Sequence, residues 1–222
     1  MKKVILTLFI SMGALVSYAQ SSQLHVGFGF PNGSFGDDDA SSSKSGFAAT
    51  GLNFGYKYYA PLSALENLSF IFSIDAFYND FQSDFKDNLE DKNPNVDITF
   101  SKYINLPVTV GLGYAIPLSE TVHLYGEGGL GTNYSWITPQ TAEYSGNESE
   151  VTYTPEFKFC YTLEGGILIN DKYTIGLKYN QLGDYKYKYK QKYTTGSSSN
   201  TSKGRISKLP ISLISLSAGI KF

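Results

Sequence analysis

The sequence predicts an all-β fold, an eight-stranded antiparallel up-and-down transmembrane β-barrel. Three observations lead to this prediction. Eight stretches of the chain alternate apolar with small or polar residues, the connections between them alternate in length, and the polar face carries few charges. Because successive side chains of a strand point to opposite faces, such alternation indicates strands with one apolar face. Eight is an even number and the smallest usual strand count of a membrane barrel.

The stretch 211–222 shows the alternation most clearly and reads ISLISLSAGIKF. One of its faces carries Ile214, Leu216, Ala218, Ile220 and Phe222. About ten alternating residues are what a tilted β-strand needs to cross a bilayer. The terminal Phe222 resembles the carboxyl-terminal insertion signal of outer-membrane barrels, and this resemblance implies the barrel-assembly machinery as a partner during insertion.

The start of the chain predicts a secretory signal peptide over residues 1–19. Lys2 and Lys3 precede an apolar run over 4–16, and Ser17 and Ala19 place small residues where a signal peptidase reads them. Cleavage is expected after Ala19, which leaves 20–222 as the barrel domain. An uncleaved membrane helix is the alternative, but the run is shorter than the roughly 20 residues that span a bilayer.

Seven further stretches carry the same alternation before the last strand, which is expected to start near Ser207. In chain order they are 23–30, 47–59, 68–79, 98–116, 122–134, 152–169 and 173–189. In 68–79, for example, Phe72 and Ile74 alternate with Ser73 and Asp75. An aromatic content of 15% and 22 glycines fit aromatic girdles around a tightly filled lumen.

The connections between these stretches are alternately short and long. The short ones are 60–67, 117–121 and 170–172, and the long ones are 31–46, 80–97, 136–151 and 190–206. Short periplasmic turns and long extracellular loops are typical of an outer-membrane barrel, and this arrangement would leave both termini in the periplasm. A soluble β-sandwich has no reason to sort its loops in this way.

The main alternative is a soluble, lipocalin-like eight-stranded barrel with its apolar face turned inward around a ligand. A water-facing surface carries about 25–35% charged residues, whereas the polar faces here are mostly Gly, Ser, Thr and Asn. Small side chains suit the inside of a narrow barrel, so the membrane barrel is favoured. The net charge of −2 argues against a nucleic-acid partner.

Charged residues on the polar faces are expected to form a paired network inside the lumen. They are Lys57, Asp75, Glu127, Lys158, Glu164, Lys178 and Lys221. Buried charges must be paired to be tolerated, and a barrel of this strand number is normally filled by its own side chains. A narrow ion path is the alternative. We predict no enzyme and no cofactor, because His25 and His123 face the lumen near its periplasmic end without a Ser-centred motif nearby.

The segment 184–193, DYKYKYKQKY, alternates lysine with tyrosine. The register of the preceding strand predicts outward tyrosines and axis-facing lysines, namely Tyr185, Tyr187 and Tyr189 against Lys186, Lys188 and Lys190. One interpretation is a protruding strand with girdle tyrosines and lysines paired to acidic loops. The other is a contact with the phosphates of lipopolysaccharide or with another partner, which cations would favour.

The run YINLP at 103–107, the glycine-rich VHLYGEGGLG at 122–131 and the closing LSAGIKF resemble the outer-membrane β-barrel family widespread in Bacteroidetes, which includes the PorT-like proteins. The fold is also similar to the OmpA transmembrane domain and OmpX. The resemblance implies an integral outer-membrane protein, in contact with lipid and lipopolysaccharide, with a structural or surface-interaction role and no catalysis. Analogy with PorT implies an accessory role in secretion or envelope assembly as the alternative. The external partner of the loops stays unidentified.

Overall fold

The structure, a computed structural model, describes residues 21–39, 45–62, 65, 67–196, 198–205 and 208–222. The expected signal peptide, its cleavage after Ala19 and the expected strand start near Ser207 lie outside these residues. Within the described residues, no helix is long and apolar enough to cross a membrane.

Eight antiparallel strands close into a barrel in the order β1-β13-β10-β9-β6-β5-β3-β2. They are β1 (Ser21–Asn32), β2 (Gly51–Pro61), β3 (Leu68–Asn79), β5 (Tyr103–Pro117), β6 (Val122–Ile137), β9 (Glu156–Ile169), β10 (Tyr173–Tyr185) and β13 (Leu209–Lys221). The first and last strands pair, with Leu24 opposite Ile220. Closure leaves no open strand edge in the barrel wall, so backbone groups are paired without water. The predicted eight-stranded barrel is confirmed.

The apolar face of the wall points outward. Val26, Phe54, Leu130, Leu163 and Leu177 lie on five different strands and are 53% to 58% exposed. The alternate positions on the same strands are buried and mostly polar. A soluble lipocalin-like barrel would show the reverse arrangement, so that alternative is wrong. The outward apolar surface is the one that a bilayer covers.

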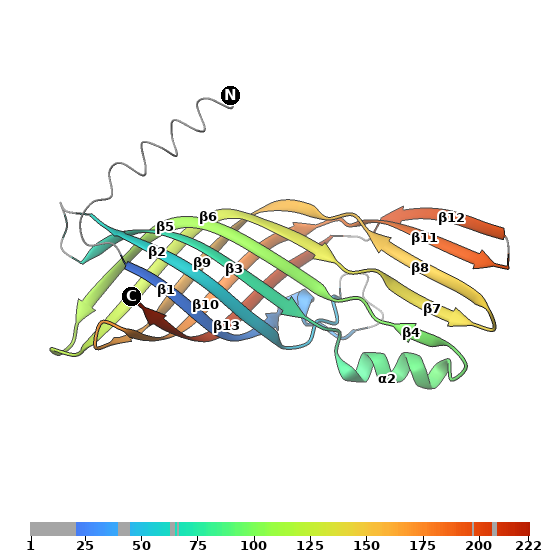
Figure 1. Cartoon of the computed structure of the whole chain (residues 1–222), viewed down its shortest axis with the longest axis horizontal. Helices are drawn as coiled ribbons and strands as arrows, with labels where there is room; N and C mark the ends of the chain where they lie inside the picture. The colour runs from blue at the N-terminus through green and yellow to red at the C-terminus, as the bar shows by residue number, and fades with distance from the viewer. Residues whose placement is uncertain (1–20, 40–44, 63–64, 66, 197, 206–207) are drawn as a thin grey trace, which may run out of the picture.

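A second, five-stranded sheet extends beyond the barrel at the end of the long connections, in the order β12-β11-β8-β7-β4 (Figure 1). Its strands are β4 (Asp97–Thr99), β7 (Gln140–Tyr144), β8 (Asn147–Tyr153), β11 (Lys188–Thr195) and β12 (Ser198–Arg205). We call it the external sheet. The C-terminus lies at the other end of the barrel, with the short turns (Figure 1).

The external sheet corrects the expected loops and three expected strands. The predicted loops 136–151 and 190–206 are mostly strand, because β7 pairs with β8 and β11 pairs with both β8 and β12. The predicted strands 98–116, 152–169 and 173–189 are each divided between a barrel strand and a strand of the external sheet. The alternating pattern therefore runs on from each barrel strand into the external sheet. The usual length of a membrane-spanning strand was the one sequence criterion that could have separated the barrel strand from the external strand.

Two short helical elements also lie at the long-connection end, and the sequence analysis missed both. The 3-10 helix η1 (Gly33–Phe35) places Phe35 fully buried in the barrel mouth, edge-on to Tyr103 at a ring distance of 4.9 Å. Helix α2 (Ser83–Lys92) has Asp84 in its first turn and Lys92 in its last, which suits the helix dipole.

Candidate functional site: the lumen and the external sheet

The half of the lumen nearer the short turns contains a buried polar network with two centres. At the first centre, Lys57 Nζ donates hydrogen bonds to Glu127 and to Glu164, both at 2.6 Å. At the second, Asp75 accepts a hydrogen bond from Lys178 Nζ at 2.6 Å and lies 2.8 Å from His25 Nε2. Strands β1, β2, β3, β6, β9 and β10 each supply one of these residues, so the network ties the wall together across the lumen.

Two of the predicted network residues lie elsewhere. The Lys158 side chain is 38% exposed at the opposite end of the barrel and lies 3.3 Å from Glu156. Lys221 lies at the short-turn mouth, with its Nζ 4.6 Å from the centre of the Tyr59 ring. Alternation assigns a side chain to the lumen side but does not give its height along the barrel, which decides what it can reach.

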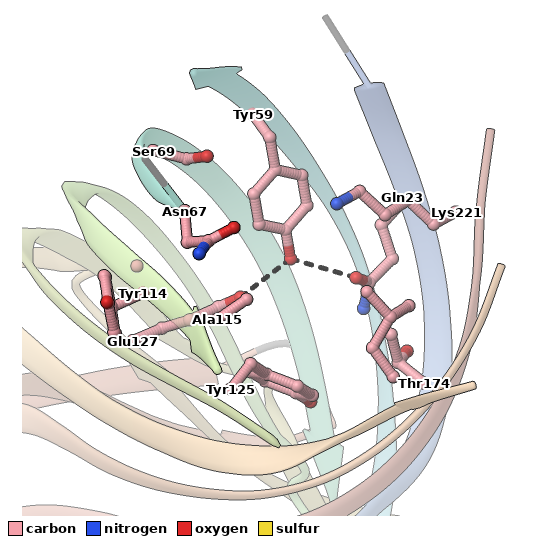
Figure 2. A pocket seen from close by; sticks show the side chains of 12 residues that line it. Gln23, Tyr59, Asn67, Ser69, Tyr114, Ala115, Tyr125, Glu127, Thr174 and Lys221 are labelled. Carbon is pink, nitrogen blue, oxygen red and sulfur yellow. Dashed lines mark hydrogen bonds between the residues drawn. The ribbon is translucent and has the colours of Figure 1, made fainter. Parts of the chain in front are cut away.

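Sequence reasoning missed two tyrosines of the network. The Tyr59 hydroxyl bridges the network to Gln23: its oxygen lies 2.9 Å from Gln23 Oε1 and 2.9 Å from Glu127 Oε1 (Figure 2). Tyr125 donates a hydrogen bond to Glu164 at 2.9 Å. Both could have been found, because Tyr59 shares the strand face of Lys57 and Tyr125 shares that of Glu127.

The lumen is narrow and filled by side chains. A cavity of about 50 Å³ lies at the short-turn mouth. Figure 2 shows Tyr59, Tyr125, Glu127 and Lys221 among the side chains that line it. A second cavity beside Lys57 measures about 20 Å³. Typical small-molecule sites occupy about 300–1,000 Å³. Among the described residues, no group of three His, Cys, Asp or Glu side chains is placed to hold a metal ion.

The half of the lumen nearer the external sheet is closed by an aromatic plug. Its buried members are Phe35, Ala48, Phe77, Tyr103, Ile137, Cys160, Leu182, Tyr185, Tyr187, Leu209, Ile211 and Leu213. The rings of Tyr185 and Tyr187 stack at 5.3 Å. The Tyr185 hydroxyl donates a hydrogen bond to the Leu182 carbonyl at 3.0 Å. The Tyr187 hydroxyl is hydrogen-bonded to the Ser135 hydroxyl. The plug separates the polar network from the outside.

The expected orientation of the lysine–tyrosine segment was wrong. Tyr185 and Tyr187 are 0% exposed and point inward, whereas Lys186, Lys188 and Lys190 are exposed. The reason is a β-bulge in β10, where Gln181 pairs with Ser212 and Gly183 with Ile211, so that one extra residue reverses every later side chain. Gly183 has a φ of +109°, which residues other than glycine rarely adopt. The Tyr189 side chain points to the same inward side as Tyr185 and Tyr187.

The external sheet has two chemically different faces. Its inner face continues the lumen side of the wall, and its outer face continues the lipid-facing side. Register places Lys188 opposite Arg205 and Lys190 opposite Lys203 on the outer face, near the barrel. Acidic residues occupy the outer face nearer the tip, namely Asp97, Glu143, Glu148 and Glu150. The outer face is therefore basic beside the membrane and acidic away from it.

The basic part of the outer face forms a groove of about 440 Å³. It is lined by Thr154, Lys188, Tyr189, Lys190, Lys203, Gly204 and Arg205. None of its four cations forms an ion pair with a carboxylate of a described residue. Like charges directly opposite on paired strands are destabilising, and here two such pairs are adjacent. An anion bound in the groove would offset this repulsion.

The inner face carries tyrosines and uncharged polar groups. Tyr153 and Tyr189 lie next to each other at a ring distance of 6.4 Å. Burial raises the pKa of the Tyr153 phenol, and the neighbouring Tyr189 raises it further. Gln191 donates a hydrogen bond to Ser149 at 3.2 Å.

The fold and the outward apolar surface define an integral β-barrel membrane protein. The family model described as "Outer membrane protein beta-barrel domain" matches residues 4–222. The chain therefore belongs to the outer membrane protein β-barrel domain family, and it is an outer-membrane protein. In barrels of this membrane the short turns face the periplasm, which places the external sheet outside the cell.

Solved structures resemble the fold at low identity. A major outer membrane protein from Thermus thermophilus is 12% identical, with 92% of this chain and all of that chain (100%) covered and a TM-score of 0.50. OprG from Pseudomonas aeruginosa is 15% identical, with 93% and 98% covered and a TM-score of 0.49. Neisserial surface protein A is 13% identical, with 91% and 95% covered and a TM-score of 0.46. A comparison with curated proteins finds no match.

Proposed function

We propose that this protein is a surface-interaction barrel whose external sheet binds phosphate groups of lipopolysaccharide in the basic groove of its outer face. Two opposed pairs of like charge carry the proposal, namely Lys188 with Arg205 and Lys190 with Lys203. Lysine and arginine form charge-assisted hydrogen bonds to phosphate oxygens. A phosphate bound in the groove would offset the repulsion between these strands.

The position of the groove supports a lipid phosphate. Phe157 and Phe159, which are 69% and 64% exposed, belong to the lipid-facing surface of β9. The groove begins three residues before Phe157 in the chain, at Thr154, whose backbone N–H donates a hydrogen bond to the Lys188 carbonyl at 2.9 Å. This position beyond the apolar band, on the outward side of the sheet, supports the proposal that its cations meet anionic headgroups there.

A titration tests this proposal. The full chain in detergent micelles is titrated with lipopolysaccharide and with the same lipopolysaccharide after removal of its phosphates. We expect Lys190→Gln with Lys203→Gln to weaken binding at least about tenfold, since one charge-assisted bond is worth roughly 1.5–3 kcal/mol. Lys92→Gln, at the exposed end of α2, is the control and should bind like the unchanged protein. Equal affinity for the dephosphorylated form contradicts the proposal.

We also infer the export and insertion steps from the two ends of the chain. Residues 1–19 are removed after Ala19, and Phe222 is the signal that the barrel-assembly machinery reads. Phe222 is 68% exposed, and its backbone N–H donates to the Ser22 carbonyl at 2.8 Å, which places it at the seam of the barrel. Intact mass of the mature protein tests the cleavage, and Phe222→Ser should lower the amount of inserted barrel.

An accessory role in secretion or envelope assembly, as in PorT-like proteins, is the alternative proposal. Its support is the resemblance of the 103–131 region and the closing strand to that Bacteroidetes family. Replacing 188–205 by a short turn separates the two roles. Loss of surface binding with normal secretion favours the surface-interaction role, whereas a secretion defect favours the accessory role.

A further inference from the structure

The inner face of the external sheet is a second surface that the lipopolysaccharide proposal does not use. Its positions on the four longer strands are Gln140, Ala142, Tyr144, Asn147, Ser149, Val151, Tyr153, Tyr189, Gln191, Tyr193, Thr195, Ser198, Asn200, Ser202 and Gly204. None of these is charged. The opposite face of the same strands is rich in lysine and glutamate, so the lack of charge belongs to this face and not to the strands.

Tyrosines provide the contact area of the inner face. Tyr144 and Tyr193 are 52% and 48% exposed, and Tyr153 and Tyr189 are partly buried next to each other. The Tyr189 ring lies directly against Gly204, where any larger side chain would displace it. The hydroxyls of Tyr144, Tyr189 and Tyr193 form no hydrogen bond with the residues that the structure describes. Their polar ends are therefore available to a ligand.

Rigid tyrosines surrounded by Ser, Asn, Gln and Gly are the composition of a recognition surface. Tyrosine supplies a large amphipathic contact at low entropic cost, and small polar residues supply adaptable hydrogen bonds. We propose that this inner face binds a neutral glycan, with sugar rings stacked on Tyr189 and Tyr193 and sugar hydroxyls bonded to Gln191 and its neighbours.

The charge of the face selects this ligand class. A phosphorylated or sulfated glycan would find no cation here, while the basic groove on the other face offers four. A cationic ligand would find no carboxylate. A neutral glycan loses little by leaving water for a face of uncharged donors and acceptors, because its hydroxyls are hydrogen-bonded again.

The direction of the face argues against a second copy of the chain as its occupant. The face continues the lumen side of the wall, since Tyr189 has the same orientation as the inward Tyr187 two residues earlier. It therefore looks across the closed mouth of the barrel. Two barrels in one membrane approach each other through their outer walls, so they would not bring these faces together.

Calorimetric titration of the full chain in micelles tests the proposal with neutral oligosaccharides of glucose, galactose, mannose or N-acetylglucosamine. We expect at least one to bind, with an affinity that does not change between low and high salt. Tyr193→Ala and Tyr189→Ala should each weaken it about five- to tenfold, as expected for the loss of one stacking ring. Tyr193→Phe keeps the ring and should retain most of the affinity.

Two controls keep the result specific. Gel mobility without boiling reports that each variant is a folded barrel, and Lys190→Gln with Lys203→Gln should leave neutral-glycan binding unchanged. The proposal is overturned if none of the oligosaccharides binds, if binding survives both alanine variants, or if it disappears with the lysine variant. A dimer that dissociates on Tyr193→Ala would also overturn it, in favour of a second copy. These outcomes are independent of lipopolysaccharide binding to the outer face.

Discussion

The barrel wall and the external sheet use the same alternation of side chains with opposite results. In the wall, apolar residues point outward and the charged network is inside. In the external sheet, lysines and glutamates point outward and tyrosines are inside. The chain passes from one arrangement to the other over a few residues, and in β10 a bulge makes the switch. The comparison teaches that the surroundings of each segment, lipid or water, set which face must be apolar.

The largest expected effect comes from removing one partner of the ion-pair network inside the barrel. Lys57→Met leaves Glu127 and Glu164 directly opposite each other without their shared cation. Removing one partner of a buried ion pair costs about 3–5 kcal/mol, so the folded barrel should unfold at lower urea concentration in lipid vesicles. Lys158→Met, at the half-exposed position outside the network, is the matched control and should change stability little. Equal stability of both variants would show that the network does not hold the wall together.

The next test compares the outside of the wall with the outside of the sheet. Val26→Arg places a charge in the middle of the lipid-facing surface of β1 and should cost about 2–4 kcal/mol in a bilayer. Ser199→Arg places the same charge on the exposed outer face of β12, opposite the uncharged Thr194, and should be nearly neutral. Urea unfolding of both variants in vesicles gives the comparison. A similar loss in both would mean that the external sheet also contacts lipid.

The third test strains the backbone at the β10 bulge, where the side chains change sides. Gly183→Val introduces a branched side chain at a φ of +109°, where its Cβ would come 2.6 Å from Lys158 Cβ. We expect a loss of about 1–3 kcal/mol and a larger population of misfolded barrel in gels of unboiled samples. Gly196→Val, at a positive φ in open space at the β11–β12 turn, separates backbone strain from this clash. An unchanged Gly183→Val protein would show that the bulge is not required.

The smallest expected effect is a gain in the stability of the folded protein. Lys190→Glu replaces one of the opposed like-charge pairs by a pair of opposite charge with Lys203. We expect stabilisation by about 0.2–1 kcal/mol together with weaker lipopolysaccharide binding. Thermal unfolding in micelles without lipopolysaccharide measures the first, and titration measures the second. A destabilised variant would mean that the two lysines do not repel each other in the folded protein.

The seven lumen residues show how far sequence reasoning reached into the candidate site. Lys57, Asp75, Glu127, Glu164 and Lys178 meet in the lumen, as alternation and the need to pair buried charges predict. Lys158 was assigned to the correct side of the wall, but it lies too far along the barrel to join the network and pairs with Glu156 instead. Height depends on the stagger between strands that are far apart in the chain, and a single sequence does not contain it.

The orientation of Tyr185 and Tyr187 shows the same limit more sharply. Alternation propagates from residue to residue, so one unrecognised extra residue at the bulge reverses everything after it. Gly183 was the available signal, because an isolated glycine inside a strand pattern often marks a bulge. The sequence alone did not distinguish it from the other glycines that alternate along the wall.

By itself the sequence determined the strand number, the closure of the barrel, the side of the wall that meets lipid and the paired charges in the lumen. These features follow from local periodicity and from the cost of unpaired groups in an apolar medium, which act on each strand separately. The tertiary structure alone decided the external sheet, the aromatic plug and the two faces on which both binding proposals rest. They depend on pairing between hairpins distant in the chain and on a reversal at one residue, and neither is encoded by the period of any single segment.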